Sequence, residues 1–68
     1  MADALQNRLR EARTAAGWTQ AELAERVGVS RKTINTVENG VFVPSTVLAL
    51  KLARALSMPV EGLFSLIE

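Results

Sequence analysis

The sequence of 68 residues contains no cysteine, no histidine and no tyrosine. Without cysteine and histidine there can be no disulfide, no thiolate zinc site, no catalytic cysteine and no imidazole chemistry. There is also no glycine-rich phosphate loop and no carboxylate pair within a fold large enough to build a pocket around it. We therefore expect neither an enzyme nor a bound cofactor, metal or small-molecule ligand.

Long hydrophobic runs are absent as well. No apolar stretch approaches the roughly 18 residues that a membrane-spanning helix requires, so we expect no contact with a membrane. The first residues carry charges throughout and lack the apolar stretch of a signal peptide. A chain without cysteine suits a reducing compartment, and we expect a cytoplasmic protein.

The charge balance is close to neutral. Eight Lys and Arg residues face seven Asp and Glu residues, which leaves a net charge of +1. If the chain binds nucleic acid, a local patch and dimer symmetry must supply the affinity that bulk electrostatics cannot. The hydrophobic fraction of 49% is ordinary for a globular protein. We expect one domain over residues 1–68, which must pack its helices well or associate with a second copy.

Residues 19–40 have the pattern of a helix-turn-helix, with two short helices joined by a tight turn. The first helix starts with a capping box, in which the side chains of Thr19 and Glu22 each accept a hydrogen bond from the other's backbone N–H. Gly28 ends this helix, Ser30 caps the next one, and Gly40 ends it in turn. Their expected apolar faces consist of Ala21, Leu23, Ala24 and Val27 in the first helix and Ile34 and Val37 in the second.

The outer face of the second helix carries cations, amides and a hydroxyl but no acidic residue. Arg31 and Lys32 stand in the first turn, where the helix dipole disfavours a cation by about 0.3–1 kcal/mol. An anionic partner would reverse that penalty, and the remaining polar side chains can donate to base edges and phosphates. Two alternatives remain open: a helical hairpin within an ordinary bundle, and a solvated basic turn with no binding role.

The rest of the chain predicts further helices. A first helix over residues 4–16 has an apolar stripe, while its charged residues Arg8, Arg10 and Glu11 face outward and Arg13 faces partly inward. Ser45 caps a helix over residues 46–56, and Pro59 precedes a short helix over residues 60–65. The stripe of the first helix consists of Leu5, Leu9, Ala12 and Ala16. We expect an all-α fold, with Trp18 partly buried in the core.

The C-terminal part holds more apolar residues than one small core needs, which suggests an interface. We predict a twofold dimer through residues 41–68, the alternative being that these residues close the core of the monomer. The interface candidates are Phe42, Leu48, Leu63, Phe64, Leu66 and Ile67.

Several stretches together resemble a known family. The strings TQAELAERVGVS and TINTVENG, followed by Pro44-Ser45 and LKLARAL, are similar to the Cro/C1-type, or XRE-like, helix-turn-helix domain. The resemblance runs from about Arg8 to Phe64 and implies a compact five-helix, lambda-repressor-like domain with a central helix-turn-helix. Three positions depart from the family pattern, namely Val41, Pro59 and Gly62.

The resemblance also implies roles for individual residues. The second helix of the motif would enter the major groove of double-stranded DNA. Base contacts would come from Arg31, Lys32, Asn35 and Thr36. Contacts to the DNA backbone would come from Thr19, Gln20, Ser30 and Asn39, and Gln20 could also brace a reading side chain. Arg13 and Glu38 would form a mostly buried salt bridge with a structural role.

The expected function is that of a sequence-specific transcriptional regulator, such as a repressor, that binds a palindromic operator as a homodimer. The alternative is an antitoxin-like or adaptor module that uses the same fold to bind a protein. DNA binding that falls steeply with salt would favour the first reading over the second.

Overall fold

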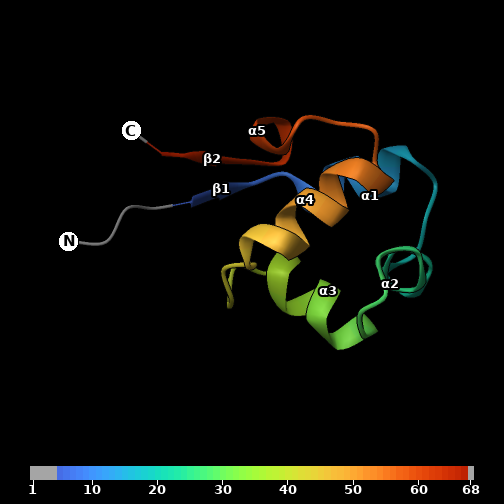
Figure 1. Cartoon of the computed structure of the whole chain (residues 1–68). Helices are drawn as coiled ribbons and strands as arrows, with labels where there is room; N and C mark the ends of the chain where they lie inside the picture. The colour runs from blue at the N-terminus through green and yellow to red at the C-terminus, as the bar shows by residue number, and fades with distance from the viewer. Residues whose placement is uncertain (1–4, 68) are drawn as a thin grey trace.

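The computed structural model describes residues 5–67 and contains five helices and one pair of short strands (Figure 1). In chain order the elements are β1 (Leu5–Asn7), α1 (Leu9–Ala15), α2 (Gln20–Val27), α3 (Arg31–Glu38), α4 (Thr46–Ala55), α5 (Val60–Leu63) and β2 (Phe64–Leu66). The predicted helix-turn-helix is confirmed as α2, a short turn and α3. None of the helices in residues 5–67 has the length and apolar character needed to cross a membrane.

The predicted capping signals set the starts of α2, α3 and α4 and the end of α2. Thr19 and Glu22 form the complete capping box at the start of α2. The side chain of Ser30 accepts a hydrogen bond from the Thr33 N–H, and that of Ser45 caps α4 in the same way. At the other end of α2, Gly28 adopts the left-handed conformation with a φ of 77°. These interactions satisfy backbone groups that a helix end leaves free.

The C-terminal end of α4 departs from this use of glycine. At Ser57 the N–H donates to the Arg54 carbonyl and the next N–H, of Met58, donates to the Ala53 carbonyl. This is the Schellman arrangement, whose central residue is left-handed and is usually glycine. Ser57 has a φ of 55° and is the only non-glycine residue of the described chain with a positive φ.

Replacing Ser57 with glycine is expected to stabilise the fold by about 0.5–1 kcal/mol, because glycine adopts the left-handed conformation without the strain of a Cβ. Urea unfolding followed by circular dichroism would measure the change. Gly28→Ala is the matched control, since no heavy atom lies within 4 Å of the added Cβ and only the positive φ opposes it. We expect this control to lose about 1 kcal/mol. A neutral or destabilising Ser57→Gly would contradict the reading of this turn.

The core lies between the helices, and every helix contributes to it. Ten hydrophobic residues of the described chain are buried, and Leu9, Leu23, Ile34, Leu52 and Leu63 are fully enclosed. Trp18 packs partly buried against this core, as predicted. Ala24 is buried but Ala21 is exposed, so the placement of Ala21 on the buried apolar face of α2 is wrong.

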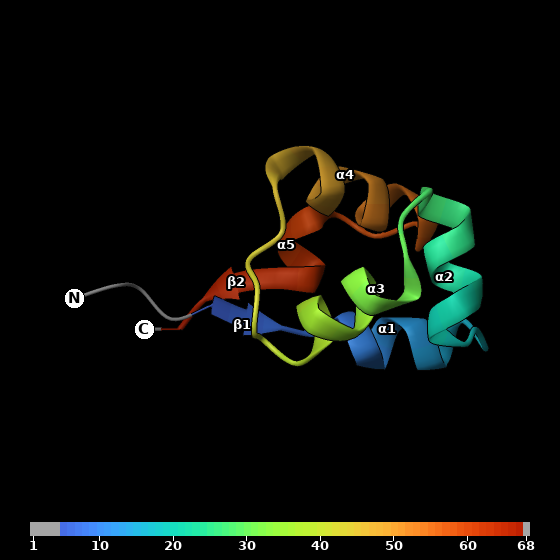
Figure 2. The same cartoon turned by 90° about the horizontal axis from the view of Figure 1, so that it is seen from below.

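The prediction of an all-α fold is wrong in one respect, because β1 and β2 form a two-stranded antiparallel sheet. Leu5 pairs with Leu66, Gln6 with Ser65 and Asn7 with Phe64. Figure 2 shows the two strands side by side beyond α3 and α5. Leu5 therefore lies in a strand and not in the first helix, while residue 4, the predicted helix start, lies outside the described residues.

Hydrogen bonds explain why the first helix starts late. The Arg8 N–H donates to the Leu63 carbonyl at 2.8 Å, and the Leu9 N–H donates to the side-chain oxygen of Asn7 at 2.9 Å. The Asn7 amide nitrogen in turn donates to the Val37 carbonyl at the end of α3. The segment before Leu9 is thus held by α5 and α3. Similarly, α5 ends at Leu63 and not at residue 65, because Phe64 is extended and starts β2.

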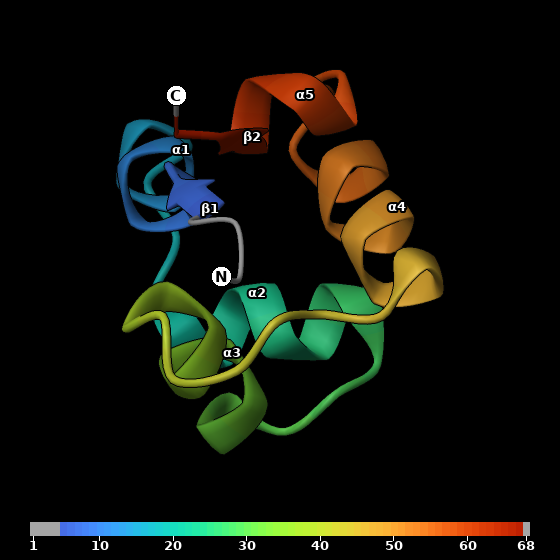
Figure 3. The ribbon, with the colours of Figure 1, turned by 90° about the vertical axis from the view of Figure 1, so that its left-hand side faces the viewer.

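The five helices surround the core in a ring when the molecule is viewed along the sheet (Figure 3). The segment from residue 41 to residue 45 crosses from α3 to α4 at the front of this view. Arg31, Lys32 and Asn35 on the outer side of α3 remain exposed to solvent.

Candidate nucleic-acid interface

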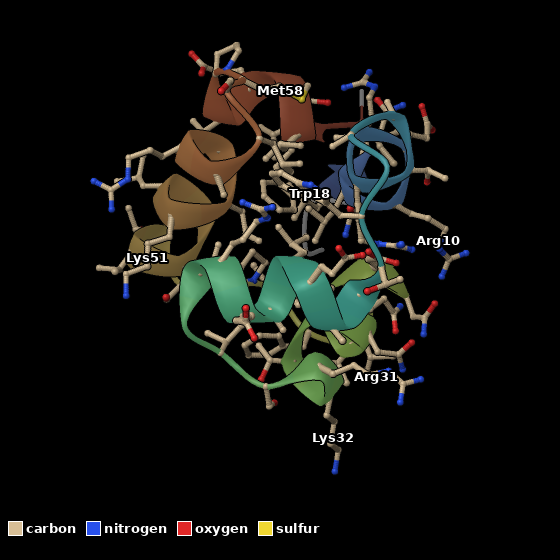
Figure 4. All side chains as sticks on the ribbon, turned by 90° about the vertical axis from the view of Figure 1, so that its right-hand side faces the viewer. Arg10, Trp18, Arg31, Lys32, Lys51 and Met58 are labelled. Atoms are coloured by element: carbon tan, nitrogen blue, oxygen red, sulfur yellow. The ribbon has the colours of Figure 1, made fainter. Side chains whose placement is uncertain are left out.

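The outer face of α3 is open to solvent. Arg31, Lys32 and Asn35 are exposed and together line a hollow of about 280 Å³. On the opposite side of the helix, Ile34 and Val37 are both 0% exposed and anchor it in the core. In Figure 4 the labelled Arg31 and Lys32 point outward from the start of α3, at the lower right and at the bottom of the view, whereas Lys51 lies at the left. The structure therefore brings together three of the four predicted base-contacting residues on one accessible surface.

The fourth candidate, Thr36, is less accessible. Its hydroxyl donates to the Thr33 carbonyl at 2.9 Å, and the side chain is half-buried. A second hollow of about 280 Å³ is lined by Ser30, Lys32, Thr33, Thr36 and Phe42. With its hydroxyl proton engaged within the helix, Thr36 offers its methyl group and an acceptor oxygen to a ligand in this hollow.

The N-terminal ends of the two motif helices carry two of the predicted phosphate-contacting residues. Thr19 is exposed, its hydroxyl accepts from the Glu22 N–H at 3.1 Å, and its own N–H donates to the Glu22 carboxylate at 2.9 Å. The hydrogen bond from the Thr19 backbone, with that from its hydroxyl, lowers the pKa of Glu22. Ser30 is exposed, and its hydroxyl lies 2.9 Å from that of Thr33.

A buried carboxylate ties α3 to the two preceding helices. The Glu38 side chain is 0% exposed, and one of its oxygens accepts from Arg13 Nε at 2.6 Å. Arg13 Nη2 and Gln20 Nε2 donate to the other oxygen at 3.2 and 3.1 Å. Arg13 also reaches the Trp18 carbonyl at 2.8 Å. The Arg13–Glu38 ion pair is thus present and joins α1 to the last residue of α3, while the hydrogen bond from Gln20 joins α2 to the same carboxylate.

Opposing effects act on the ionisation of Glu38. Burial raises its pKa, but the hydrogen bonds from Arg13, Gln20 and Arg10 outweigh burial, so the pKa lies below its ordinary value. The same contact raises the pKa of Arg13. Both groups therefore stay charged at neutral pH, and the ion pair between α1 and α3 is maintained there.

Arg10 belongs to this cluster, although sequence reasoning only placed it on the outward face. Its Nε lies 3.3 Å from the Glu38 carboxylate, and its Nη2 donates to the side-chain oxygen of Asn39 at 2.7 Å. The side chain is 59% exposed. No local pattern signals this contact, because the two partners lie 28 and 29 residues further along the chain.

Three amide side chains extend the cluster onto the surface of α3. Gln20 Nε2 donates to the Asn35 side-chain oxygen at 3.2 Å, and Asn39 Nδ2 donates to the same oxygen at 3.3 Å. The resemblance suggested that Gln20 could brace a reading side chain, and the structure places Gln20 against Asn35, one of the predicted base-contacting residues. It leaves the Gln20 backbone N–H, at the start of α2, as the group available to a phosphate.

The predicted dimer residues do not form one surface. Leu48 and Leu63 are buried at 8% and 0% exposure, because the small monomer core takes them, so the prediction that they form a dimer surface is wrong. Phe42 lies beside α3 in the second hollow. Phe64 is half-buried, and Leu66 and Ile67 are exposed. A separate groove of about 260 Å³ is lined mainly by Leu5, Val43, Pro44, Ala49, Leu50, Val60 and Phe64.

Other cations lie away from α3. Arg26 stacks over the Trp18 ring, 4.1 Å from its centroid, and lines a hollow of about 380 Å³ with Lys51 and Arg54. Residues 5–67 contain no group of acidic, histidine or cysteine residues arranged to hold a metal ion. Glu25 also lines this hollow, so its charge is mixed, whereas the hollow beside Arg31, Lys32 and Asn35 contains no acidic residue.

The sequence agrees with the family model of the helix-turn-helix over residues 9–63, which is most of the chain. The chain belongs to the Cro/C1-type helix-turn-helix family. Named relatives support the assignment. The HTH-type transcriptional regulator YgzD of Bacillus subtilis (strain 168) is 44% identical over 64 residues, covering 94% of this chain and 97% of the relative. An HTH-type transcriptional regulator of Methanothermobacter thermautotrophicus is 51% identical over 61 residues, with 88% of each chain covered.

Solved structures of this helix-turn-helix family have the same fold. The restriction-modification controller protein C.AhdI from Aeromonas hydrophila is 44% identical with a TM-score of 0.76, covering 79% of this chain and 82% of that protein. The biofilm master regulator SinR in complex with DNA is 27% identical with a TM-score of 0.75, covering 79% and 87%. The family is one of transcriptional regulators and not of enzymes, in agreement with the expectation from composition.

Proposed function

We propose that this helix-turn-helix protein is a sequence-specific DNA-binding transcriptional regulator that acts as a homodimer on a palindromic operator. The observation that carries the proposal is the open outer face of α3, where Arg31, Lys32 and Asn35 surround one hollow. This face contains no carboxylate in its exposed part, because Glu38 is enclosed and neutralised by arginine. A helix of this width fits the major groove, with its N-terminal residues at the base edges.

The proposed roles divide into two groups. Arg31, Lys32, Asn35 and Thr36 would face base edges. Thr19, Gln20, Ser30 and Asn39 would meet phosphates at either side of the groove, mainly through N–H groups at the helix N-termini and the free amide hydrogen of Asn39. The SinR complex with DNA is a structure of the same fold and supports the docking of such a domain on a duplex.

The homodimer is proposed from the exposed apolar residues that lie outside α3. Leu5, Val43 and Leu50 line one apolar groove, and Leu66 and Ile67 are 62% and 56% exposed. Two copies related by a twofold axis would place their α3 helices about 34 Å apart, in successive major grooves. Symmetry also doubles the number of phosphate contacts, which compensates for the near-neutral net charge.

Selection of bound duplexes from a random pool tests the proposal, because it reports the half-site, its repeat and the spacing. We expect an inverted repeat with half-site centres about one helical turn apart, and sedimentation equilibrium should give twice the 7.4 kDa mass of one chain. Binding that is absent at low salt, or unaffected by salt, would refute the proposal and favour a protein partner instead. Such a partner would have the basic hollow of Arg26, Lys51 and Arg54 available to it.

A further inference from the structure

The side-chain amides of Gln20, Asn35 and Asn39 form a hydrogen-bonded series, and a charged residue at each end of this series fixes their orientation. Arginine can only donate hydrogen bonds, so the atom of Asn39 that faces Arg10 at 2.7 Å must be its oxygen. The nitrogen of Asn39 then points at Asn35, where it can only meet an oxygen. At the other end, the Glu38 carboxylate can only accept, so the nitrogen of Gln20 faces it at 3.1 Å and also donates to Asn35.

Reasoning from Arg10 at one end of this hydrogen-bonded series and from Glu38 at the other gives the same orientation for the Asn35 side chain. Its side-chain oxygen accepts two hydrogen bonds, from Gln20 Nε2 at 3.2 Å and from Asn39 Nδ2 at 3.3 Å. A carbonyl oxygen has two lone pairs, so its accepting capacity is filled. The Asn35 nitrogen has no hydrogen-bond partner among residues 5–67, and it belongs to an exposed residue that lines the hollow with Arg31 and Lys32.

This arrangement determines what Asn35 can read. An asparagine that recognises adenine uses both atoms, its oxygen accepting from N6 and its nitrogen donating to N7. With its oxygen occupied, Asn35 can only donate. Guanine is the base whose major-groove edge presents two neighbouring acceptors, N7 and O6, and no donor.

We propose that Asn35 is a donor-only reader that selects guanine against adenine, and that Gln20 and Asn39 are positioning residues that hold it in this state. The inference rests on the proposed DNA-binding function and specifies the base that this site takes. Arg10 and Glu38 do not contact Asn35, but they determine which atom of Asn39 and which atom of Gln20 faces it.

The free protein provides a test that does not involve DNA. In ¹⁵N-labelled protein, the Gln20 side-chain amide protons should exchange with water more slowly than those of Asn35, because only the former are hydrogen-bonded. Gln20→Met should shift the side-chain amide resonances of Asn35. Slow exchange at Asn35 with fast exchange at Gln20 would overturn the proposal.

The base preference is tested on the operator obtained by selection. The position to examine is the base pair at which Asn35→Ala abolishes the protein's preference for one base. We expect guanine there, and we expect replacement by adenine or by 7-deazaguanine to weaken binding of the unaltered protein about fivefold, the equivalent of one hydrogen bond. Asn35→Ala should be indifferent to both replacements. The double variant Gln20→Met/Asn39→Ala frees the Asn35 oxygen, so its ratio of guanine to adenine affinity should fall to one or below. This ratio cancels general losses of stability or phosphate contact.

The possible outcomes separate the two proposals. Preference for any base other than guanine, or no base pair that responds to Asn35→Ala, would overturn the role of Asn35 while leaving sequence-specific binding intact. Equal binding of selected and scrambled duplexes by the unaltered protein would overturn the proposed function and the inference with it. If the double variant does not fold, as judged by circular dichroism, the 7-deazaguanine and exchange measurements on the unaltered chain still decide the matter.

Discussion

Arg13→Met is expected to destabilise the protein by about 3–5 kcal/mol, because it leaves the Glu38 carboxylate buried without its main partner. A domain of this size rarely has more than about 3–5 kcal/mol of stability in total, so the variant should be largely unfolded at 25 °C. Urea unfolding followed by circular dichroism would measure the loss. The reason lies in the geometry, since Glu38 is 0% exposed and receives two of its hydrogen bonds from Arg13.

Two control variants separate this explanation from a general loss of packing. Arg10→Met removes a partner that is 59% exposed, and it should cost less than about 1 kcal/mol. The double variant Arg13→Met/Glu38→Leu removes both buried charges and should recover much of the loss, because no unpaired group remains. An Arg13→Met variant as stable as the Arg10→Met control would show that the ion pair contributes little.

Protonation of Glu38 should have the same effect in the unaltered protein. Its pKa in the folded state lies below the ordinary value, so the charged form binds its partners better than the protonated form does. The stability that ionised Glu38 contributes is present in full above the pKa that this residue has in the unfolded chain. It is lost as the pH falls through the pKa of Glu38 in the folded state. We therefore expect stability to decline below about pH 5 and not at alkaline pH.

Arg31→Ala is expected to lower affinity for the selected operator about 10- to 100-fold, because a bidentate arginine contact to guanine contributes about 1–3 kcal/mol of discrimination. Affinity for a scrambled duplex should fall much less, since only one charge is lost there. Titration of both duplexes at one fixed salt concentration would measure the two changes.

Lys51→Ala is the matched control for Arg31→Ala. It removes one positive charge from an exposed residue of α4, on the opposite side of Figure 4 from Arg31. We expect small and equal changes on both duplexes. Equal losses on the specific and scrambled duplexes by Arg31→Ala would mean that Arg31 contacts phosphate and not a base.

The local part of the fold could be read from the sequence because its signals act within one helical turn. The capping box of Thr19 and Glu22 and the cap of Ser30 on the Thr33 N–H each join residues three positions apart. The Gly28 N–H at the end of α2 donates to the Ala24 and Glu25 carbonyls, four and three positions back. The buried faces of α2 and α3 followed from helical periodicity for the same reason. The open face of α3 is what remains once those buried residues are assigned.

The errors have a different origin, since they concern contacts between distant parts of the chain. Leu5 and Leu9 fit the spacing of a helical stripe, but pairing of Leu5 with Leu66 takes the first of them into a strand. An excess of apolar residues indicates that some surface must be apolar without indicating which residues it contains. Leu48 and Leu63 went to the core, whereas Leu66 and Ile67 remain exposed.

The candidate site shows the same division. Helix geometry predicted an outer face that consists of Lys32, Asn35, Thr36 and Asn39, with Arg31 at its flank in the first turn. The pairing of Arg13 with Glu38 came only from the resemblance to a family, because nothing in the spacing of two residues 25 positions apart indicates it. Neither the contribution of Arg10 nor the orientation of the Asn35 amide could be predicted from the sequence, since both depend on side chains that α1, α2 and α3 bring together.

The most direct measurement of the central claim is a titration of the ¹⁵N-labelled protein with its selected duplex, followed by nuclear magnetic resonance. If the open face of α3 receives the DNA, the largest shifts and the line broadening should fall on Arg31, Lys32, Asn35 and Thr36, with smaller changes at Thr19 and Gln20. Changes centred instead on Lys51, Arg54 and the rest of α4, with the signals of α3 unmoved, would contradict the account.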